Sequence, residues 1–431
     1  MTEESIFILF RNLTIVFASV MLVKYFIFLN LAAIYGVRTS LRRLRVVRES
    51  IRRYSSLRAY KPTVSVIVPA WNEEVGIVAT LQSIIDNTYN DVEIVVVNDG
   101  STDRSRELVD SFIKSLESSD RHGNNKTVRQ HYVSNGGKGC ALNIGIKKSH
   151  GEIIVTMDAD SALEKDAIEN IVEHFRDERV AAVVGQVRIA NTRGRLIGRM
   201  QQLEYLFGFY FKRAHCVIGA EYIYGGACTA FRRSLTFDSF GVFDETNKTE
   251  DIEMSMRTKY HGLRSIYAED VICYTEGAST YAGLINQRLR WKKGRFDTFV
   301  RYRRMFFSWT RHHNKPLAWF VLPLALFAEL QLILEPISAT LLITYSLISD
   351  EFVSLALSML FVGISYFVVA FFGVRLSLWE RIRLIFLWPL TWLSFYLIVW
   401  IEFHALVRSL HMGLRGDELE WQQWKREGID T

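Results

Sequence analysis

The chain has 431 residues, of which 49% are hydrophobic, and its formal net charge is +6. This length allows more than one domain. The positive charge is concentrated beside apolar runs, which argues against nucleic-acid binding, and the four widely spaced cysteines form no Cys-X-X-Cys pair, which argues against a disulfide or zinc framework.

The first apolar run, Leu13 to Tyr35, is as long as the roughly 20 residues that cross a bilayer. Lys24 lies near its middle and would cost ~2.5–3.5 kcal/mol there. The Leu, Ile, Val and Phe residues of the run contribute roughly 4–8 kcal/mol in the other direction. We therefore predict a transmembrane anchor in residues 1–37.

A basic juxtamembrane segment, residues 38–61, follows this anchor and has Glu49 as its only acid. Cytoplasmic loops of membrane proteins carry an excess of Lys and Arg, so this segment and the domain after it are predicted to be cytosolic. Its basic side chains can form a solvated helix face or lie on anionic membrane lipids.

Residues 62–304 alternate short apolar strands with helices. The predicted strands are Val64–Val68, Val92–Val97, Val128–Val133, Ile153–Met157 and Val180–Val187. The predicted helices are Glu74–Asn87, Arg104–Leu116, Ala141–Lys148, Lys165–Arg176 and Leu196–Val217. Alternation of this kind predicts an α/β, Rossmann-like domain with a mostly parallel sheet and right-handed crossovers.

Residues 305–410 are predicted to form a C-terminal membrane region, with candidate spans at Leu317–Ile348, Phe352–Val374 and Leu384–Val407. In the last of these, Pro389 breaks the helix and Glu402 would cost ~2.5–3.5 kcal/mol at the middle of a membrane. We therefore predict that this segment does not simply cross and that the tail, residues 411–431, stays cytosolic. The alternative is that Glu402 lies near a helix end and that the segment spans.

Two acids follow the buried strand Ile153–Met157. Asp158 and Asp160 are spaced i, i+2, so they share a face if the extended backbone continues. Ligands of open α/β sheets collect beyond the carboxyl ends of the strands, and two carboxylates there suit a hard divalent cation that also bridges to phosphates. The alternative is a solvated acidic turn.

Two further loops follow strands and open helices. In residues 98–103, Asp99 is placed to accept hydrogen bonds from a nucleotide base or ribose. In residues 135–143, glycines let backbone amides approach an anion, and Lys138 adds a cation. Each loop alone is also an ordinary strand-to-helix turn.

The sequence Thr249-Glu250-Asp251 begins a predicted helix. Threonine is a good N-cap and acids suit a first helical turn, so a purely structural role is open. The functional interpretation makes Asp251 a general base, because an alcohol nucleophile must lose its proton as it attacks.

The sequence Gln287-Arg288-Leu289-Arg290-Trp291 is the most specific short motif. On a helix, Gln287, Arg290 and Trp291 share one face. Arginine can bind a diphosphate with two parallel hydrogen bonds, and tryptophan offers a flat apolar platform for a sugar. A membrane-surface helix would explain the arginines and Trp291, but not Gln287.

Together, the motifs between Val64 and Gly294 resemble those of membrane-bound, processive family-2 glycosyltransferases, the family of hyaluronan, chitin, cellulose and poly-N-acetylglucosamine synthases. The resemblance implies the GT-A nucleotide-sugar fold, an inverting reaction and Mg²⁺ or Mn²⁺ as cofactor. It makes Asp251 the catalytic base and Asp160 the metal ligand. The predicted substrate-binding residues are Pro69, Asn72, Glu73, Asp99, Lys138, Asp158, Glu250, Gln287, Arg290 and Trp291.

Residues 225–234, followed by Gly241, look most similar to the poly-N-acetylglucosamine synthases within this family. We therefore expect UDP-N-acetylglucosamine as donor and a growing polysaccharide or a lipid as acceptor. We expect a multi-pass protein of the plasma (inner) membrane with its catalytic domain in the cytosol, in contact with membrane lipids and open to accessory membrane subunits. The alternatives are a non-processive enzyme that makes one glycolipid and an inactive scaffold that binds nucleotide-sugar.

Overall fold

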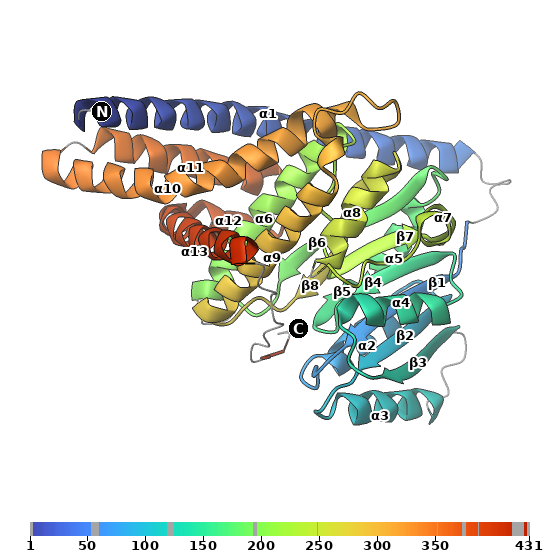
Figure 1. The fold of residues 1–431 in the computed structure, drawn as a ribbon. Coiled ribbons are helices and arrows are strands. Elements are labelled where there is room, and N and C mark those ends of the chain that lie inside the picture. The colour runs from blue at the N-terminus through green and yellow to red at the C-terminus, as the bar shows by residue number, and fades with distance from the viewer. Residues whose placement is uncertain are drawn as a thin grey trace.

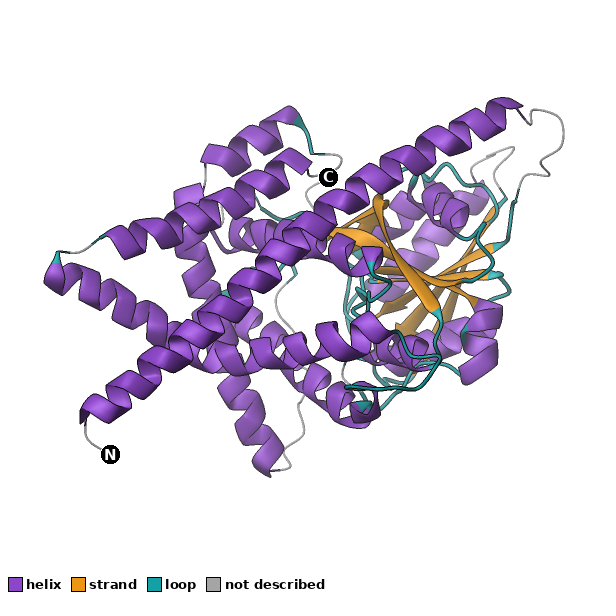
Figure 2. Cartoon of the chain, turned by 90° about the horizontal axis from the view of Figure 1, so that it is seen from above, coloured by secondary structure: helices purple, strands orange, loops and turns teal. Residues whose placement is uncertain are grey.

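The computed structural model describes residues 3–52, 60–118, 125–192, 196–247, 249–350, 352–372, 376–386, 388–415 and 426–428. An α/β body and a region of long helices lie side by side (Figure 1). Seen from above, the sheet occupies one end of the molecule and α1 runs along both parts (Figure 2).

One sheet has the strand order β3-β2-β1-β4-β7-β6-β8-β5. The strands β1, β2, β3 and β4 are parallel, as the sequence predicted. The prediction is incomplete for the second half, because β7 runs antiparallel to both β4 and β6, and β5 runs antiparallel to β8. The strand bounds are β1 Val64–Ala70, β2 Val92–Asp99, β3 Lys126–Val133, β4 Ile153–Met157, β5 Ser161–Leu163, β6 Val180–Ile189, β7 Cys228–Arg232 and β8 Arg264–Thr275.

The direction of β7 follows from the path of the chain after β6. Helix α6 (Leu196–Val217) and the segment after it return the chain to the edge of the sheet that it left. Since β7 enters the sheet from that edge, the glycines Gly225 and Gly226 lie beside the carboxyl ends of the parallel strands.

Helices cover both faces of the sheet, and β1 and β4 are therefore buried along their whole length. Alternate strand residues point to opposite faces, so Val66 and Ile67 belong to different cores. One core contains apolar residues of α2 (Ile77–Ile85), α3 (Ser105–Ser118) and α5 (Ala167–His174). The other contains residues of α4 (Lys138–Lys148), α7 (Phe237–Phe240) and α8 (Glu250–Tyr260).

The long helices beside the sheet and α9 are α1, α6, α10, α11 and α13, with the shorter α12 between α11 and α13. Among the residues that the structure describes, two stretches are long and apolar enough to cross a membrane, Leu22–Thr39 and Leu317–Ile348, and Leu355–Val369 is a shorter apolar helix. The first two overlap the predicted anchor and the first predicted C-terminal span, while a multi-pass topology stays a prediction. The helix bounds are α1 Glu3–Arg52, α9 Tyr281–Arg301, α10 Leu322–Ser349, α11 Val353–Phe372, α12 Leu378–Phe386 and α13 Trp388–Arg415.

The segment Leu384–Val407 is divided between two helices, because α12 ends at Phe386 and α13 begins at Trp388 beside Pro389. The cost given for Glu402 applies to a carboxylate alone at the middle of a membrane, and here Glu402 forms ion pairs with Arg288 at 3.3 Å and Lys292 at 2.7 Å. Whether this segment crosses a membrane stays a prediction. Of the tail, Arg426 contacts Asp160 and Glu73, and the amide of Glu427 donates a hydrogen bond to Glu276, while the side of the membrane on which the tail lies stays a prediction. Residues 53–59, part of the predicted basic segment, and residues 416–425 and 429–431 lie outside the described residues.

Candidate active site

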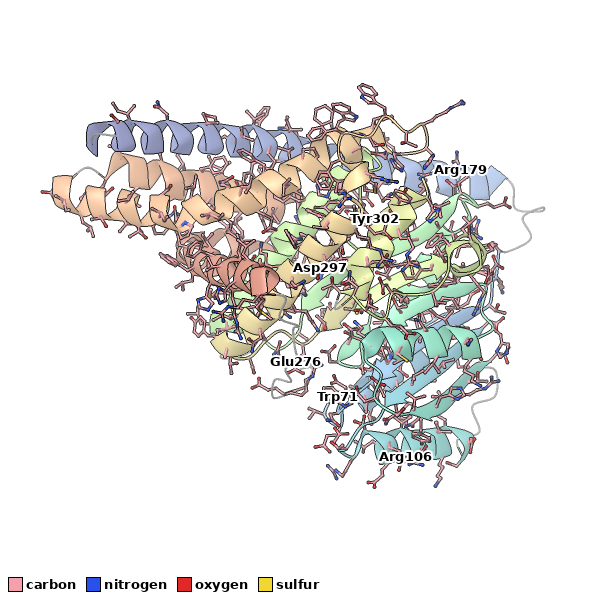
Figure 3. The ribbon with its side chains drawn as sticks, viewed as in Figure 1. Trp71, Arg106, Arg179, Glu276, Asp297 and Tyr302 are labelled. Carbon is pink, nitrogen blue, oxygen red and sulfur yellow. The ribbon has the colours of Figure 1, made fainter. Side chains whose placement is uncertain are left out.

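The carboxyl edge of the sheet gathers acidic side chains from four separate parts of the chain. Glu73 follows β1, Asp160 follows β4 and Glu276 follows β8. Parallel strands end at the same edge, which is why residues so far apart in sequence meet there. In Figure 3, Glu276 and Trp71, which precedes Glu73 by two residues, lie at this edge.

Lys138 links the acids of β4 to those of α8. Its Nζ lies 2.7 Å from Asp158 Oδ1 and 2.9 Å from Glu250 Oε1. Burial alone would lower the pKa of this lysine, but the carboxylates of Asp158, Glu250 and Asp251 outweigh burial and raise it. Lys138 is therefore held as a cation at the first turn of α4.

Gly226 lies where three of these side chains converge. A Cβ atom added to this glycine would lie 2.9 Å from Lys138 Nζ, 3.3 Å from Asp251 Oδ2 and 3.6 Å from Asp158 Oδ2. Only a residue without a side chain leaves this space open. The predicted base, the predicted donor-binding acid and the predicted phosphate-binding lysine thus share one small space.

Asp251 is in the first turn of α8, and its Oδ1 accepts a hydrogen bond of 2.8 Å from the Ile252 amide. Burial is the largest cause that raises the pKa of Asp251 to about 6, and the charge of Glu250 adds to it, while Lys138 opposes it. A carboxylate with this pKa is both ionised at neutral pH and basic enough to accept a proton during a reaction.

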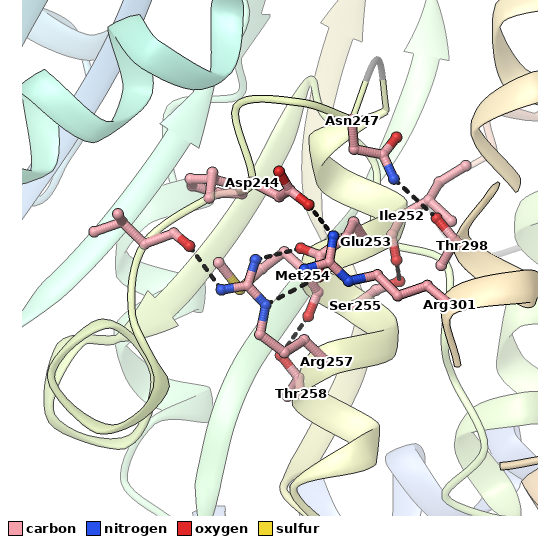
Figure 4. Close-up of polar contacts among 12 residues, drawn as sticks. Asp244, Asn247, Ile252, Glu253, Met254, Ser255, Arg257, Thr258, Thr298 and Arg301 are labelled. Carbon is pink, nitrogen blue, oxygen red and sulfur yellow. Dashed lines mark hydrogen bonds and ion pairs between the residues drawn. The ribbon is translucent and has the colours of Figure 1, made fainter. Parts of the chain in front are cut away.

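The loop before α8 is held by α9, as Figure 4 shows. Asn247 Nδ2 donates a hydrogen bond of 3.2 Å to Thr298 Oγ1, and Arg301 forms an ion pair with Asp244. The backbone of α9 also approaches α8 directly, because a Cβ atom on Gly294 would lie 1.9 Å from Thr249 Oγ1. The position of Asp251 thus depends on the position of α9.

Residues 426–428 of the tail contact Glu73, Asp160 and Glu276 at the carboxyl edge of the sheet. Arg426 Nη1 lies 2.5 Å from Asp160 Oδ2, and its Nη2 pairs with Glu73. The carboxylate of Glu276 accepts hydrogen bonds from the amides of Glu427 at 2.8 Å and Gly428 at 3.3 Å. Burial raises the pKa of Glu73 to about 8, against the opposing charge of Arg426.

The chain shares its sequence pattern with a known family over most of this region. The model of the glycosyl transferase family group 2 matches residues 153–408, more than half of the chain, and that of glycosyl transferase family 2 matches residues 65–238. The chain belongs to the family-2 glycosyltransferases.

Named relatives agree with this assignment. The poly-beta-1,6-N-acetyl-D-glucosamine synthase of Staphylococcus aureus (strain COL) is 32% identical over 257 residues, which are 59% of this chain and 59% of the relative. The synthase of the same name from Staphylococcus epidermidis is 29% identical over 262 residues, which are 60% of each chain. The matched part is thus less than two thirds of the length of these curated relatives.

A solved structure supports the fold. The mannosyltransferase PcManGT from Pyrobaculum calidifontis, in complex with GDP-Man and Mn²⁺, is similar with a TM-score of 0.55 and 20% identity, over 91% of this chain and 100% of that chain. This likeness shows a GT-A-type glycosyltransferase fold, as the resemblance implied. The sheet is mixed: the pairs β1–β2, β1–β4, β2–β3 and β6–β8 are parallel, as the sequence predicted, while β7 and β5 are reversed.

In this family-2 glycosyltransferase, some residues that were predicted to bind the sugar donor form hydrogen bonds within the protein or are buried in the sheet. Asp99 accepts hydrogen bonds from the amides of Gly136 at 2.7 Å and Gly137 at 2.9 Å, so the anion that the glycine loop approaches is this carboxylate. Asn72 Oδ1 accepts a hydrogen bond of 2.7 Å from the Thr102 amide and ties two loops together. Pro69 is buried within β1. Their contacts with a donor stay predictions.

The predicted face of α9 is present, and its roles stay predictions too. Gln287 is buried, and its Oε1 has no hydrogen-bond partner among the described residues. Trp291 packs near Tyr205 of α6, with ring centroids 6.5 Å apart, and the Arg288 guanidinium lies 4.4 Å from the centre of the Trp291 ring. Arg290, the third member of this face, is partly buried.

Sequence reasoning missed three members of this site. Glu276 is a single charged residue in a segment without a motif, so no local pattern could reveal it. Arg426 belongs to the tail that was predicted to stay cytosolic, but its contacts with Asp160 and Glu73 were not predicted. Gly226 was noticed only as part of a glycine-broken segment. Its role depends on side chains from α4, β4 and α8 that meet in space.

The residues at the carboxyl edge fit a divalent cation in their chemistry. Asp160, Asp158 and Glu73 supply hard oxygen ligands, and Glu73 Oε2 is a buried oxygen without a hydrogen-bond partner among the described residues. The guanidinium between Asp160 and Glu73 shows that this position accepts positive charge. No ready group of three His, Cys, Asp or Glu ligands occurs among the described residues, so a cation here would complete its shell with phosphate oxygens and water.

Proposed function

We propose that this chain is an inverting glycosyltransferase that transfers N-acetylglucosamine from UDP-N-acetylglucosamine to a growing β-linked polysaccharide. The observation that carries the proposal is the convergence of Asp251, Lys138 and Asp158 around Gly226. It brings a carboxylate of pKa about 6 next to a cation and to the acids at the end of β4. A sugar transferred from a nucleoside diphosphate needs these three functions in one place.

The proposed reaction is one in-line displacement. Asp251 takes the proton from an acceptor hydroxyl as the hydroxyl oxygen forms a bond to C1 of the donor sugar. The bond between C1 and the diphosphate oxygen breaks, and UDP leaves with the electron pair. Attack from the opposite face inverts the anomeric centre from α to β.

The chain's own cations assist the departure of UDP. Lys138 is held beside Asp158 and can stabilise the negative charge that develops on the diphosphate. Mg²⁺ or Mn²⁺, held by Asp160 with Asp158 and Glu73, would supply Lewis-acid stabilisation of the same charge. Arg290 of α9 is proposed to add a second cation, as its motif predicts.

The choice of sugar is supported by the relatives rather than by the geometry. Two relatives are named as synthases of poly-β-1,6-N-acetyl-D-glucosamine, and both match 59–60% of this chain. The proposed membrane location and polymer export are supported by the two apolar stretches Leu22–Thr39 and Leu317–Ile348. Accessory subunits and lipid contacts belong to the same proposal.

A donor panel tests this function. Purified full-length protein in detergent or nanodiscs would be incubated with UDP-N-acetylglucosamine, UDP-glucose or UDP-glucuronate, and UDP release would be measured with and without Mn²⁺. We expect release with UDP-N-acetylglucosamine and a labelled product of many sugar units. Release with a product of one sugar on lipid would replace the polymer by the glycolipid alternative. Absence of release with every donor would leave only a binding scaffold.

A further inference from the structure

Helix α9 carries a second set of charged residues that the proposed chemistry does not use. Arg288, Lys292 and Arg295 follow one another at i, i+4 and i+7, so they form one stripe along the helix. Gln287, Trp291 and Gly294 have the same spacing but lie on a different side of α9. The helix therefore has one side for the active site and another for the long helices.

The basic stripe pairs with carboxylates from three helices. Arg288 lies 2.6 Å from Glu204 of α6 and 3.3 Å from Glu402 of α13. Lys292 lies 2.7 Å from both Glu402 and Glu329 of α10. We call these residues, together with Arg295, which pairs with Glu329 at 2.6 Å, the α9 ion-pair cluster.

The cluster is balanced and largely removed from water. It contains three cations and three anions, and the side chain of Arg288 is only 4% exposed. Buried ion pairs add little net stability compared with apolar packing, but they specify one arrangement of the partners. A slip of α9 by one turn, about 5.4 Å, would move Lys292 to the place of Arg288 and Arg295 to that of Lys292, and would leave one end of the cluster unpaired. A rotation of α9 about its own axis would separate all of the pairs. The cluster therefore fixes the register of α9 against the long helices.

The position of α9 affects the proposed reacting groups through two contacts. Arg288 lies against the ring of Trp291, so its pairs with Glu204 and Glu402 also set the place of that ring. On the other side, Gly294 is packed against Thr249, two residues before Asp251. A small displacement of α9 would therefore move both the predicted acceptor platform and the predicted base.

We propose that Glu329 and Glu402 are positioning residues for sugar transfer: through the α9 ion-pair cluster they hold Trp291 and Asp251 in their working positions. This inference rests on the proposed function, and it gives a role to Glu329 and Glu402 in helices that are mostly apolar. A carboxylate in such a helix is costly and usually functional. Neither residue needs to touch the substrate.

The test compares variants of the full-length protein that change the net charge of the cluster with one that keeps the cluster neutral but removes the ion pairs between α9 and α13. Glu402→Gln and Glu329→Gln each remove one anion. The double variant Lys292→Met with Glu402→Gln removes one cation and one anion, so the remaining cluster is neutral but α9 loses its pairs with α13. Glu335→Gln is the matched control, because Glu335 is on the same helix as Glu329 and forms no ion pair with α9 among the described residues.

Four quantities would be measured: kcat and KM for UDP-N-acetylglucosamine by UDP release, the thermal midpoint, and hydrogen–deuterium exchange of residues 241–260. We expect Glu402→Gln to lower kcat at least tenfold, to change KM less than twofold and to speed exchange at the start of α8. The double variant should regain the thermal midpoint but not kcat. Glu335→Gln should keep kcat within twofold.

Two outcomes would overturn the inference. One is a Glu402→Gln variant with wild-type kcat and wild-type exchange. The other is a double variant in which kcat recovers together with the thermal midpoint, since charge balance alone would then be the cluster's role. If wild-type protein transfers no sugar, the proposed function fails, and the exchange measurement still decides whether the cluster holds α8 through α9.

Discussion

Two groups of charged side chains in this molecule differ in their balance. The carboxyl edge of the sheet brings together six acids, Glu73, Asp158, Asp160, Glu250, Asp251 and Glu276, around two described cations, Lys138 and Arg426. The α9 ion-pair cluster brings together three acids and three cations. Both groups are drawn from distant parts of the chain.

The difference indicates different tasks. Burial, with the charge of neighbouring carboxylates as a smaller cause, raises the pKa of Glu73 and of Asp251, and the excess of carboxylates attracts further positive charge. Such a site is prepared to bind a cation and to accept a proton. The α9 ion-pair cluster has equal numbers of cations and anions and therefore no net charge that would attract a ligand. Its effect is on the arrangement of the helices that it joins.

Loss of Asp251 should give the largest effect and separate the two groups most clearly. Asp251→Asn keeps the shape but removes the basic oxygen, so kcat should fall by ~10²–10⁴, while UDP affinity changes less than about threefold. UDP release and isothermal titration with UDP measure the two quantities. Asp238→Asn, at an exposed position on α7, is the control. A variant that keeps more than about a tenth of wild-type kcat would show that Asp251 is not the base.

Gly226→Ala should break the convergence at the carboxyl edge without changing any charge. The added methyl group would lie 2.9 Å from Lys138 Nζ, so the lysine or Asp251 must move. Because a displacement of about 1 Å at a reacting group can cost ~10²-fold, we expect kcat/KM to fall by up to that factor. Gly225→Ala is a matched neighbour, since its methyl group would meet only Val187 at 3.5 Å. Equal activity of both variants would contradict the convergence.

Arg426→Gln should make the acid excess at the carboxyl edge larger. The arginine pairs with Asp160 and Glu73, the acids proposed to hold the metal, so it competes with a divalent cation. When Arg426 occupies the site, the apparent affinity for Mn²⁺ is reduced in proportion to the fraction of sites that are free. We therefore expect Mn²⁺ to bind roughly 3–10-fold more tightly to the variant. Electron paramagnetic resonance of free Mn²⁺ measures this without any turnover. Asp160→Ala should have the opposite effect, and unchanged Mn²⁺ binding in that variant would place the metal elsewhere.

The smallest expected effect concerns pH. Asp251 acts as a base only when ionised, so kcat/KM should rise with pH through about 6, the value to which burial and Glu250 raise its pKa. Glu250→Gln removes one of these causes and lowers the pKa of Asp251, so the acid limb should move to lower pH. A pH profile of UDP release from pH 5 to 8 shows the direction, with Glu107→Gln on the distant α3 as control. A shift to higher pH would contradict the proposed electrostatics.

The amino-acid sequence alone determined the first half of the sheet and indicated the residues that we propose as reacting groups. Strands β1 and β4 are continuous apolar runs because both of their faces are buried, and such runs can be recognised from the local sequence. Asp158, Asp160, Lys138 and Asp251 each stand at a strand end or a helix start, where local rules apply. The family followed from the order of these motifs.

Only the tertiary structure decided which charges balance one another. Arg426 and Glu73 are 353 residues apart, and the pairs of Glu402 with α9 join the last long helix to the catalytic domain. The direction of β7, and with it the place of Gly226, also depends on where the chain re-enters the sheet. Local patterns report burial and helix or strand period, whereas a charge is paired or left in excess according to contacts between segments that no local pattern connects.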